Sequence, residues 1–503
     1  MNRSMRSALS LLAAAGLISS CGSNPPAPAI ADVNGGLSGS GTLGSVFILD
    51  GSGFGDLSAQ TLGYSLDFRD ATSNAVVASA TSTVNYASGA WKSLFITATV
   101  PATGLNAGTT YKVTITTPNG TSDPVNFLIL AAQPYVPNTV WTKTSSLPAA
   151  TQGFPTAVAT IGTGSAATLY VYALGGNTAS ATTANGKAAN SSAVSFNQLD
   201  PATGALSLAS WTQATSLPAA RGFSAAAVAT SFNSKVGGNG TIYVLGGLDA
   251  TGAATSTVYE ASLNADGSIP AASAGTWTTL ATPLPQALFA HGAVIFHGRI
   301  YVAGGNDISG APVAKAYSAP INADGTLGAW TTLADLPDSR AYHQFVTMTG
   351  NLYVLGGTNV AVDPISNVQS AGAQSAIFYE GINIQDGSLT GAAWTNNATG
   401  LSKSREKFSA AVAGGGVLAS GGLYNGASSG ATEQEFASIN TDGSLAGFTT
   451  VTGAYTVSKA TGGYNFYNQS SASFADSAGK PHVLILGGAD VNTGAPHAEV
   501  WYQ

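Results

Sequence analysis

Short apolar runs that end in two glycines recur along most of the chain. The clearest copy is IYVAGG at 300–305, and five further copies keep the β-branched run with small changes. A short apolar run bounded by glycine predicts a buried strand, with the glycines at its exit into a turn or at a close backbone contact. The first glycines of successive pairs are 71, 58, 52, 65 and 66 residues apart, so the chain holds six copies of one long unit. The pairs are Gly175 and Gly176, Gly246 and Gly247, Gly304 and Gly305, Gly356 and Gly357, Gly421 and Gly422, and Gly487 and Gly488.

Each unit has room for four strands. In the third unit, the runs at 290–296, 300–305, 315–322 and 327–337 predict them in order. The pair Asp324-Gly325 predicts a type I′ turn between the third and fourth strands. A large ring on the fourth strand recurs, and we expect it to pack one unit on the next. These residues are Trp211, Trp277, Trp330, Trp394 and Phe448. Six units of about 50 residues or more, each with several strands, predict a β-propeller.

The glycine pair, the fourth-strand tryptophan and a following Leu-Pro resemble kelch repeats over about 140–503. That resemblance implies a six-bladed kelch-type β-propeller over 139–503. The chain stops at 498–503 with a third strand that has no fourth strand after it. Trp141, with Leu-Pro at 147–148, has the pattern of a fourth strand that precedes the first glycine pair. We therefore predict that 139–146 completes the sixth blade beside 498–503 and removes an exposed sheet edge.

The segment 29–130 has a different pattern. Alternating or apolar runs separated by Gly, Asn and Pro predict a β-sandwich of about 100 residues. Its opening and closing motifs, FILDGSGFG at 47–55 and YKVTITTPNGTSDPVNF at 111–127, resemble an IPT/TIG immunoglobulin-like domain. The glycines at 51, 53 and 55 are interpreted as backbone geometry, because no capped helix follows them to hold a phosphate. Residues 131–138 form the predicted linker.

The first 20 residues predict a signal peptide. Arg3 and Arg6 precede an apolar run at 8–18 that is too short to span a bilayer. The run ends in ISSC, which resembles a bacterial lipobox and implies lipidation of Cys21, the only cysteine. The alternative is an ordinary signal peptide with a chance cysteine. With a tether at 21–28, the lipobox reading predicts an envelope protein held on the membrane by acyl chains. Gly22 implies the outer membrane if the source is Gram-negative.

Composition narrows the class of function. Charged residues make up 8% of 503 residues, against about 25% in typical soluble proteins. The net charge is −7, and the 17 Lys and Arg residues form no cluster, so nucleic-acid binding has no electrostatic support. An extracytoplasmic β protein fits this composition better than a cytosolic enzyme.

Candidate site residues lie four positions after the leucine of each Leu-Pro. These positions hold Thr151, Arg221, Leu288, Arg340, Arg405 and Thr461. With the long loops 177–192 and 358–376, they are expected on one face of the ring. Arginine pairs with carboxylates, so one hypothesis is an anion or sugar pocket. That pocket would be completed by His291, Tyr342, His343 and Glu406, with ring faces from Phe223 and Phe408. The favoured alternative is that each arginine bonds backbone carbonyls of the adjoining blade and that both histidines are neutral and structural. Two histidines without a third ligand predict no metal site.

Three functions remain open from the sequence. The first is an envelope-anchored binding protein whose propeller face recognises a glycan or a protein. The second is an enzyme, because six-bladed kelch proteins include periplasmic sialic-acid mutarotases. That resemblance would give Arg221, Arg340, Arg405, His343 and Glu406 roles on an acidic sugar. The third is a structural envelope component. No cofactor is predicted, and the cysteine–tyrosine cofactor of galactose oxidase is excluded because Cys21 lies in the leader.

Overall fold

A computed structural model describes most of the chain from residue 27 onward. The described ranges are 27–33, 39–41, 46–54, 64–80, 95–129, 141–162, 168–200, 202–229, 239–270, 276–296, 298–322, 324–383, 387–424, 434–440, 442–451, 466–475 and 481–503. The predicted signal peptide, Cys21 and the predicted linker lie outside them. Within these ranges the protein is built of β-sheets, with the short 3-10 helix η3 (Gly186–Ala188), which confirms the all-β prediction. No helix in the described ranges has the length and hydrophobicity needed to cross a membrane.

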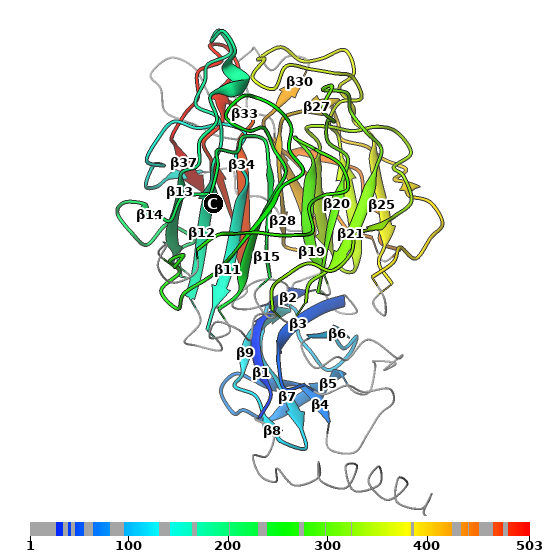
Figure 1. The fold of residues 1–503 in the computed structure, drawn as a ribbon. Helices are drawn as coiled ribbons and strands as arrows, with labels where there is room; N and C mark the ends of the chain where they lie inside the picture. Colours follow the sequence, from blue (N-terminus) through cyan, green and yellow to red (C-terminus); the bar gives the residue numbers. More distant parts are fainter. Residues whose placement is uncertain are drawn as a thin grey trace, which may run out of the picture.

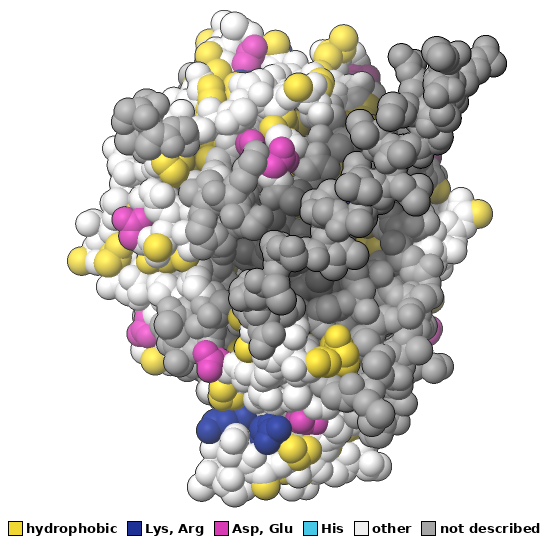
Figure 2. Space-filling view, turned by 60° about the horizontal axis from the view of Figure 1, so that its bottom comes forward, with side chains coloured by type: hydrophobic (Ala, Val, Ile, Leu, Met, Phe, Trp, Pro, Cys, Tyr) yellow, Lys and Arg dark blue, Asp and Glu magenta, His cyan; other side chains and the backbone are white. Residues whose placement is uncertain are grey.

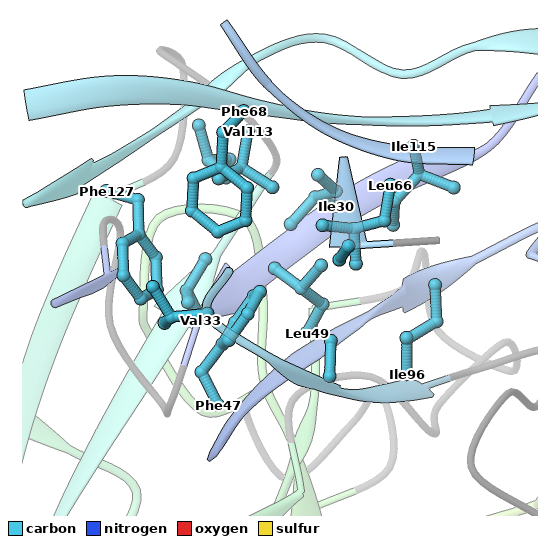
Figure 3. Packing of buried hydrophobic residues seen from close by; sticks show 14 of the residues in the cluster. Ile30, Val33, Phe47, Leu49, Leu66, Phe68, Ile96, Val113, Ile115 and Phe127 are labelled. Atoms are coloured by element: carbon cyan, nitrogen blue, oxygen red, sulfur yellow. The ribbon is translucent and has the colours of Figure 1, made fainter. Parts of the chain in front are cut away.

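The N-terminal strands form two sheets that share one core. One sheet has the order β1-β3-β6, and the other has the order β2-β9-β7-β4-β5 with β8 on β7. Figure 3 shows side chains from both sheets pointing into the space between them. The rings of Phe47, Phe68 and Phe127 meet there, with centroids 4.8–5.8 Å apart. The strands are β1 (Ala29–Val33), β2 (Gly39–Gly41), β3 (Val46–Ser52), β4 (Ser65–Asp70), β5 (Val76–Ser79), β6 (Phe95–Thr99), β7 (Thr110–Thr117), β8 (Gly120–Thr121) and β9 (Val125–Ile129).

The glycines after the second predicted strand of this segment serve backbone packing. Gly51 lies in β3 opposite β1, where an added Cβ would stand 2.0 Å from the Ala29 carbonyl oxygen. Gly53 has φ +73°, which favours glycine. The third glycine of the motif, at 55, lies outside the described residues.

In the rest of the described chain, six sheets contain four antiparallel strands each. Sheet one contains β11 (Thr156–Ile161), β12 (Thr168–Leu174), β13 (Val194–Leu199) and β14 (Thr212–Ala214). Sheet two contains β15 (Ala225–Ala229), β16 (Thr241–Leu245), β17 (Val258–Ser262) and β18 (Thr278–Thr279). Sheet three contains β19 (Gly292–Phe296), β20 (Arg299–Ala303), β21 (Ala316–Pro320) and β22 (Thr331–Thr332).

The remaining three sheets repeat this plan. Sheet four contains β23 (Gln344–Met348), β24 (Asn351–Leu355), β25 (Ile377–Gly381) and β26 (Thr395–Asn396). Sheet five contains β28 (Ser409–Ala413), β29 (Gly416–Ser420), β31 (Gln434–Ser438) and β32 (Thr449–Val451). Sheet six contains β34 (Ser470–Ala475), β35 (Pro481–Leu486), β37 (Val500–Tyr502) and β10 (Thr142–Lys143). Two small pairs flank them, β27 (Arg405–Glu406) with β30 (Leu423–Tyr424) and β33 (Phe466–Tyr467) with β36 (Ala489–Asp490).

The six sheets form a closed ring. The first strand of each sheet contacts the first strand of the next, through β11, β15, β19, β23, β28 and β34, and β34 contacts β11 again. β10 pairs with β37, with Thr142 opposite Tyr502 and Lys143 opposite Trp501. The prediction that a segment near Trp141 completes the last sheet is therefore confirmed. Figure 1 shows the sheets standing around one axis with the N-terminal strands at one end.

Side chains of the repeat link each sheet to the next. Tyr172, Tyr243, Tyr301 and Tyr353 of the glycine-pair strands donate to the carbonyls of Gly267, Gly325, Gly387 and Gly443 in the following sheet, at 2.6–2.9 Å. The indole N–H groups of Trp211, Trp277, Trp330 and Trp394 donate to carbonyls that follow the fourth strand of the preceding sheet, at 2.9–3.5 Å. These rings, with satisfied polar ends, tie neighbouring sheets together at every junction except the one between sheets five and six.

The Asp-Gly turns differ from the predicted type I′ form, so that prediction was wrong. A type I′ turn needs positive φ at both central residues. Gly325 has φ +83°, but Asp324 is not among the residues with positive φ. The Asp324 carboxylate instead accepts the N–H and hydroxyl of Thr326, at 3.0 and 2.5 Å. This side-chain bond holds aspartate in an ordinary conformation and leaves glycine alone in the left-handed region.

Candidate functional site

A ring of six backbone hydrogen bonds encircles the axis on the face that carries the longest loops. Each member donates its N–H to the carbonyl of the member in the preceding sheet, at 2.6–3.0 Å, and the sixth bond closes the circle. All six have φ between +53° and +56°. The members are Gly153, Phe223, Ala290, Tyr342, Lys407 and Asn468. Left-handed backbone at a residue other than glycine costs about 1–3 kcal/mol, so five of these positions hold strain that closure of the circle offsets.

The predicted arginine positions lie two residues before this circle. Their backbone carbonyls accept the N–H of the second glycine of the preceding sheet, at 2.7–2.9 Å. The acceptors are Thr151, Arg221, Leu288, Arg340, Arg405 and Phe466. The sixth place belongs to Phe466, which corrects the assignment to Thr461; that residue lies outside the described ranges. The glycine pairs therefore serve close contact between sheets, because their N–H groups must reach a neighbouring backbone.

The three arginine side chains are buried and already have hydrogen-bond partners within the protein. Arg221, Arg340 and Arg405 are 4%, 1% and 0% exposed. Arg221 donates to Ala220 O and Tyr259 Oη, both at 2.7 Å. Arg340 donates to Asp338 Oδ2 and Ser339 O, at 2.7 and 2.8 Å, and its guanidinium lies over Phe378.

Arg405 lies in the most enclosed setting of the three. It donates to Gly421 O at 2.9 Å and is 2.7 Å from Glu435 Oε1. The partners of Arg221 and Arg340 belong to the arginine's own sheet or to the segment just before it, so for these two residues the expectation of carbonyls from the adjoining blade was wrong. The short distance from the Leu-Pro turn to the sheet keeps each guanidinium over its own third strand. Glu435 was missed because nothing in the sequence marks a carboxylate that points inward from β31.

The histidines occupy a packing position of the repeat. The residue three after each arginine position lies between the glycine pairs of two adjacent sheets. This position holds Phe154, Ser224, His291, His343, Phe408 and Gln469. Burial lowers the pKa of His291 and of His343 to about 3, so both rings are neutral near pH 7. The described residues contain no group of three or more His, Cys, Asp or Glu side chains arranged to hold a metal.

Lys407 lies at the centre of this face. Its ammonium is buried, 5.2 Å from the ring centre of Tyr342 and 5.7 Å from that of Tyr467. It donates to Asp363 O at 2.7 Å and to Ser366 O at 2.9 Å. Burial lowers the pKa of Lys407 to about 8, although Glu406 and Asp363 oppose the shift. Sequence reasoning missed this lysine. Its position in the repeat could have been noticed, because the equivalent positions of two other sheets hold Gly153 and Asn468, residue types that tolerate positive φ.

The two long loops meet over the circle. Ile365 from the loop 358–376 is buried in a cluster with Phe223, Phe289 and Tyr342. It also packs on Gly186 of η3 in the loop 177–192, where an added Cβ would stand 2.3 Å from Ile365 Cδ1. Figure 1 shows these loops, with β27, β30 and β33, at the end of the ring away from the N-terminal sheets. Of the predicted site residues, Phe223, Tyr342 and Glu406 contact this assembly.

Glu406 fixes the far side of the same loop. Its two carboxylate oxygens accept the Ser370 N–H at 2.8 Å and the Ser370 hydroxyl at 2.6 Å. Asn468 Nδ2 donates to Pro364 O, and Tyr467 Oη donates to Ile365 O, both at 2.8 Å. The polar groups at the centre of the face thus act as hydrogen-bond donors and acceptors for a chain segment, and the arginines lie outside this set.

Comparisons with known proteins add little. No family model and no curated protein matches this chain. A solved structure titled "Structure of YjhT" is similar over 71% of this chain and 95% of its own, with 12% sequence identity and a TM-score of 0.45. At that score and identity, the likeness carries no argument about this chain.

Proposed function

We propose that this chain is an envelope-anchored binding protein. In this proposal, the ring of sheets is a six-bladed kelch-type β-propeller, the N-terminal sandwich is an immunoglobulin-like spacer, and Cys21 carries the lipid anchor. The loop-bearing face then recognises a protein or a glycan outside the membrane.

The placement of the N-terminal sheets is the observation that carries the proposal. They lie at the end of the ring opposite the loops 177–192 and 358–376, and β1 contacts β11 (Figure 1). A lipid on the chain before residue 27 would attach at that end. The loop face would then point away from the membrane, where a partner can reach it.

The composition suits a binding role, because charged residues make up only 8% of the chain and a polar surface with few charges favours contacts through hydrogen bonds and shape. Figure 2 shows the end of the molecule opposite the loops, where the charged side chains among the described residues are few and two Lys or Arg side chains lie side by side. The mutarotase hypothesis gains no support, because it needs arginines open to a sugar carboxylate, and Arg221, Arg340 and Arg405 are buried against their own sheets.

Two measurements test the proposal. Incorporation of labelled palmitate into the full chain, and its loss in Cys21→Ser, tests the anchor. Glycan arrays and crosslinking pull-downs with the full chain carrying Cys21→Ser test recognition. A partner that loses binding when exposed loop residues such as Val368 are changed to Asp would support the proposal. Clean negatives in both recognition experiments would overturn it and favour a structural envelope component.

A further inference from the structure

We propose that the mouth of the ring is a binding site for a peptide that forms a turn, and that residues 362–366 of this chain occupy that site in cis. The inference rests on the proposed binding function and deepens it, because it names a site and a class of ligand. The site, called the central seat here, consists of Phe223, Tyr342, Lys407, Tyr467 and Asn468.

The central seat holds its occupant mainly by the backbone. Four consecutive carbonyls, those of residues 363–366, accept hydrogen bonds from three side chains. Lys407 takes the first and last of them, Asn468 takes the second, and Tyr467 takes the third, all at 2.7–2.9 Å. These carbonyls belong to a turn, because the Ser366 N–H donates to Asp363 O at 3.2 Å. Donors placed on all four of its carbonyls recognise the backbone of that turn.

Apolar contacts of two side chains provide the rest of the recognition. Pro364 and Ile365 are buried, whereas Asp363 is exposed. The Ile365 side chain packs in one cluster with Phe223 and Tyr342 of the circle. Proline has no N–H, so its burial leaves no donor unsatisfied. The Asp363 carboxylate accepts the Ile365 N–H at 3.0 Å and holds the turn. The chemistry therefore fits a turn with Asp-Pro followed by a branched aliphatic residue.

The occupant is separable from the sheet that carries it. The loop stem closes at Asn359, whose N–H donates to Gly372 O at 3.1 Å. Residues 360–371 therefore lie beyond a stem that is already joined. The connection between β24 and β25 has 21 residues, 356–376, whereas the equivalent one between β20 and β21 has 12, 304–315.

Four of the five residues of the central seat belong to other sheets than the occupant, and only Tyr342 precedes the occupant's own sheet. Lys407 precedes sheet five, Tyr467 and Asn468 precede sheet six, and Phe223 precedes sheet two, whereas the loop belongs to sheet four. The strained backbone at Tyr342, Lys407 and Asn468 fixes their positions around the occupant. Such a preorganised set of donors is suited to reversible binding of a ligand.

The test uses the full chain with residues 360–371 replaced by Gly-Ser-Gly-Ser. The probe is a fluorescein-labelled peptide of the excised sequence, VAVDPISNVQSA, followed by fluorescence anisotropy. We expect the excised variant to bind the peptide saturably and the intact chain not to bind it. A peptide with Ile365→Asp should bind at least tenfold more weakly, and Lys407→Met in the excised variant should weaken binding at least fivefold.

Three outcomes would overturn the inference. The first is a cooperatively folded excised variant that shows no saturable binding. The second is equal binding of the Ile365→Asp peptide. The third is an excised variant that does not fold, because the segment would then be part of the core. The proposed function fails separately: peptide binding to the excised variant without any partner for the intact chain keeps the central seat and removes the binding role.

Discussion

Tyr342 and Lys407 are joined twice at the centre of the ring. The Lys407 N–H donates to Tyr342 O at 3.0 Å, and the Lys407 ammonium lies 5.2 Å from the centre of the Tyr342 ring. Both residues have positive φ, so the backbone bond and the cation–π contact hold two strained residues of adjacent sheets together. This pair links closure of the ring to the loop above it, because the same ammonium also binds Asp363 O and Ser366 O.

Lys407→Met should loosen the loop 358–376. The change keeps the volume of the side chain but leaves two partly buried carbonyls without their charged donor, which costs about 1–3 kcal/mol. Hydrogen exchange of residues 360–371 should become faster, while exchange in β23 and β24 stays unchanged. The control is Lys187→Met, an exposed lysine on the other long loop. Equal exchange in the wild type and Lys407→Met would show that the lysine does not hold the loop.

Lys407 should also make stability depend on alkaline pH. Its pKa in the folded protein is lowered to about 8 from 10.5, so between those values the unfolded chain binds more protons. Stability therefore rises with pH in this window, by about 1–2 kcal/mol between pH 7.5 and 9.5. Urea unfolding of the wild type and Lys407→Met at both values measures the difference. If Lys407 causes this pH dependence, the free energy of unfolding of Lys407→Met should not rise between pH 7.5 and 9.5. An equal rise in the variant would contradict the prediction.

Replacement of His343 by phenylalanine should be tolerated. Phe154 and Phe408 fill the equivalent position between glycine pairs, so the site accepts an apolar ring. The variant should also resist acid better than the wild type. The pKa of His343 is lowered to about 3, so the unfolded chain binds more protons between that pH and 6.5, and stability falls as the pH falls. The wild type should lose about 2 kcal/mol more than His343→Phe between pH 7 and pH 5. Equal loss of stability between pH 7 and pH 5 in the wild type and in His343→Phe, measured by urea unfolding, would contradict this account.

Glu435→Gln should destabilise the protein strongly. Arg405 and Glu435 are 0% and 1% exposed and 2.7 Å apart, and breaking such a buried pair costs about 3–5 kcal/mol. Asp338→Asn is a matched control, because Asp338 binds Arg340 at the same distance but is 44% exposed. Its cost should stay below about 1 kcal/mol. Similar losses in both variants would refute the argument from burial.

Closure of the ring can be tested by truncation. A chain that begins at residue 131 keeps β10, whereas a chain that begins at residue 150 exposes the edge of β37. The longer chain should be monomeric and unfold cooperatively, and the shorter one should aggregate. Light scattering and thermal melts compare the two. A stable monomer that begins at residue 150 would show that β10 is dispensable.

The repeat was readable from the sequence because its signals are local. The glycine pairs, the fourth-strand tryptophans and the unmatched strand at 498–503 led to six sheets and to the pairing of β10 with β37. Each signal depends on backbone geometry or on alternation within a few residues. The type I′ turn failed because the side-chain bond from Asp324 to Thr326 decides its conformation.

By itself, the sequence determined the all-β class, the repeated sheets and the strand that closes the ring. Only the tertiary structure decided which polar residues meet at the centre. Arg221, Arg340 and Arg405 turn toward their own sheets, whereas Lys407, Tyr467 and Asn468 converge on a loop that begins more than 30 residues earlier in the chain. The physical reason is that strand periodicity is set within a few residues, while the partner of a buried polar group is set by which distant segments the closed ring brings together.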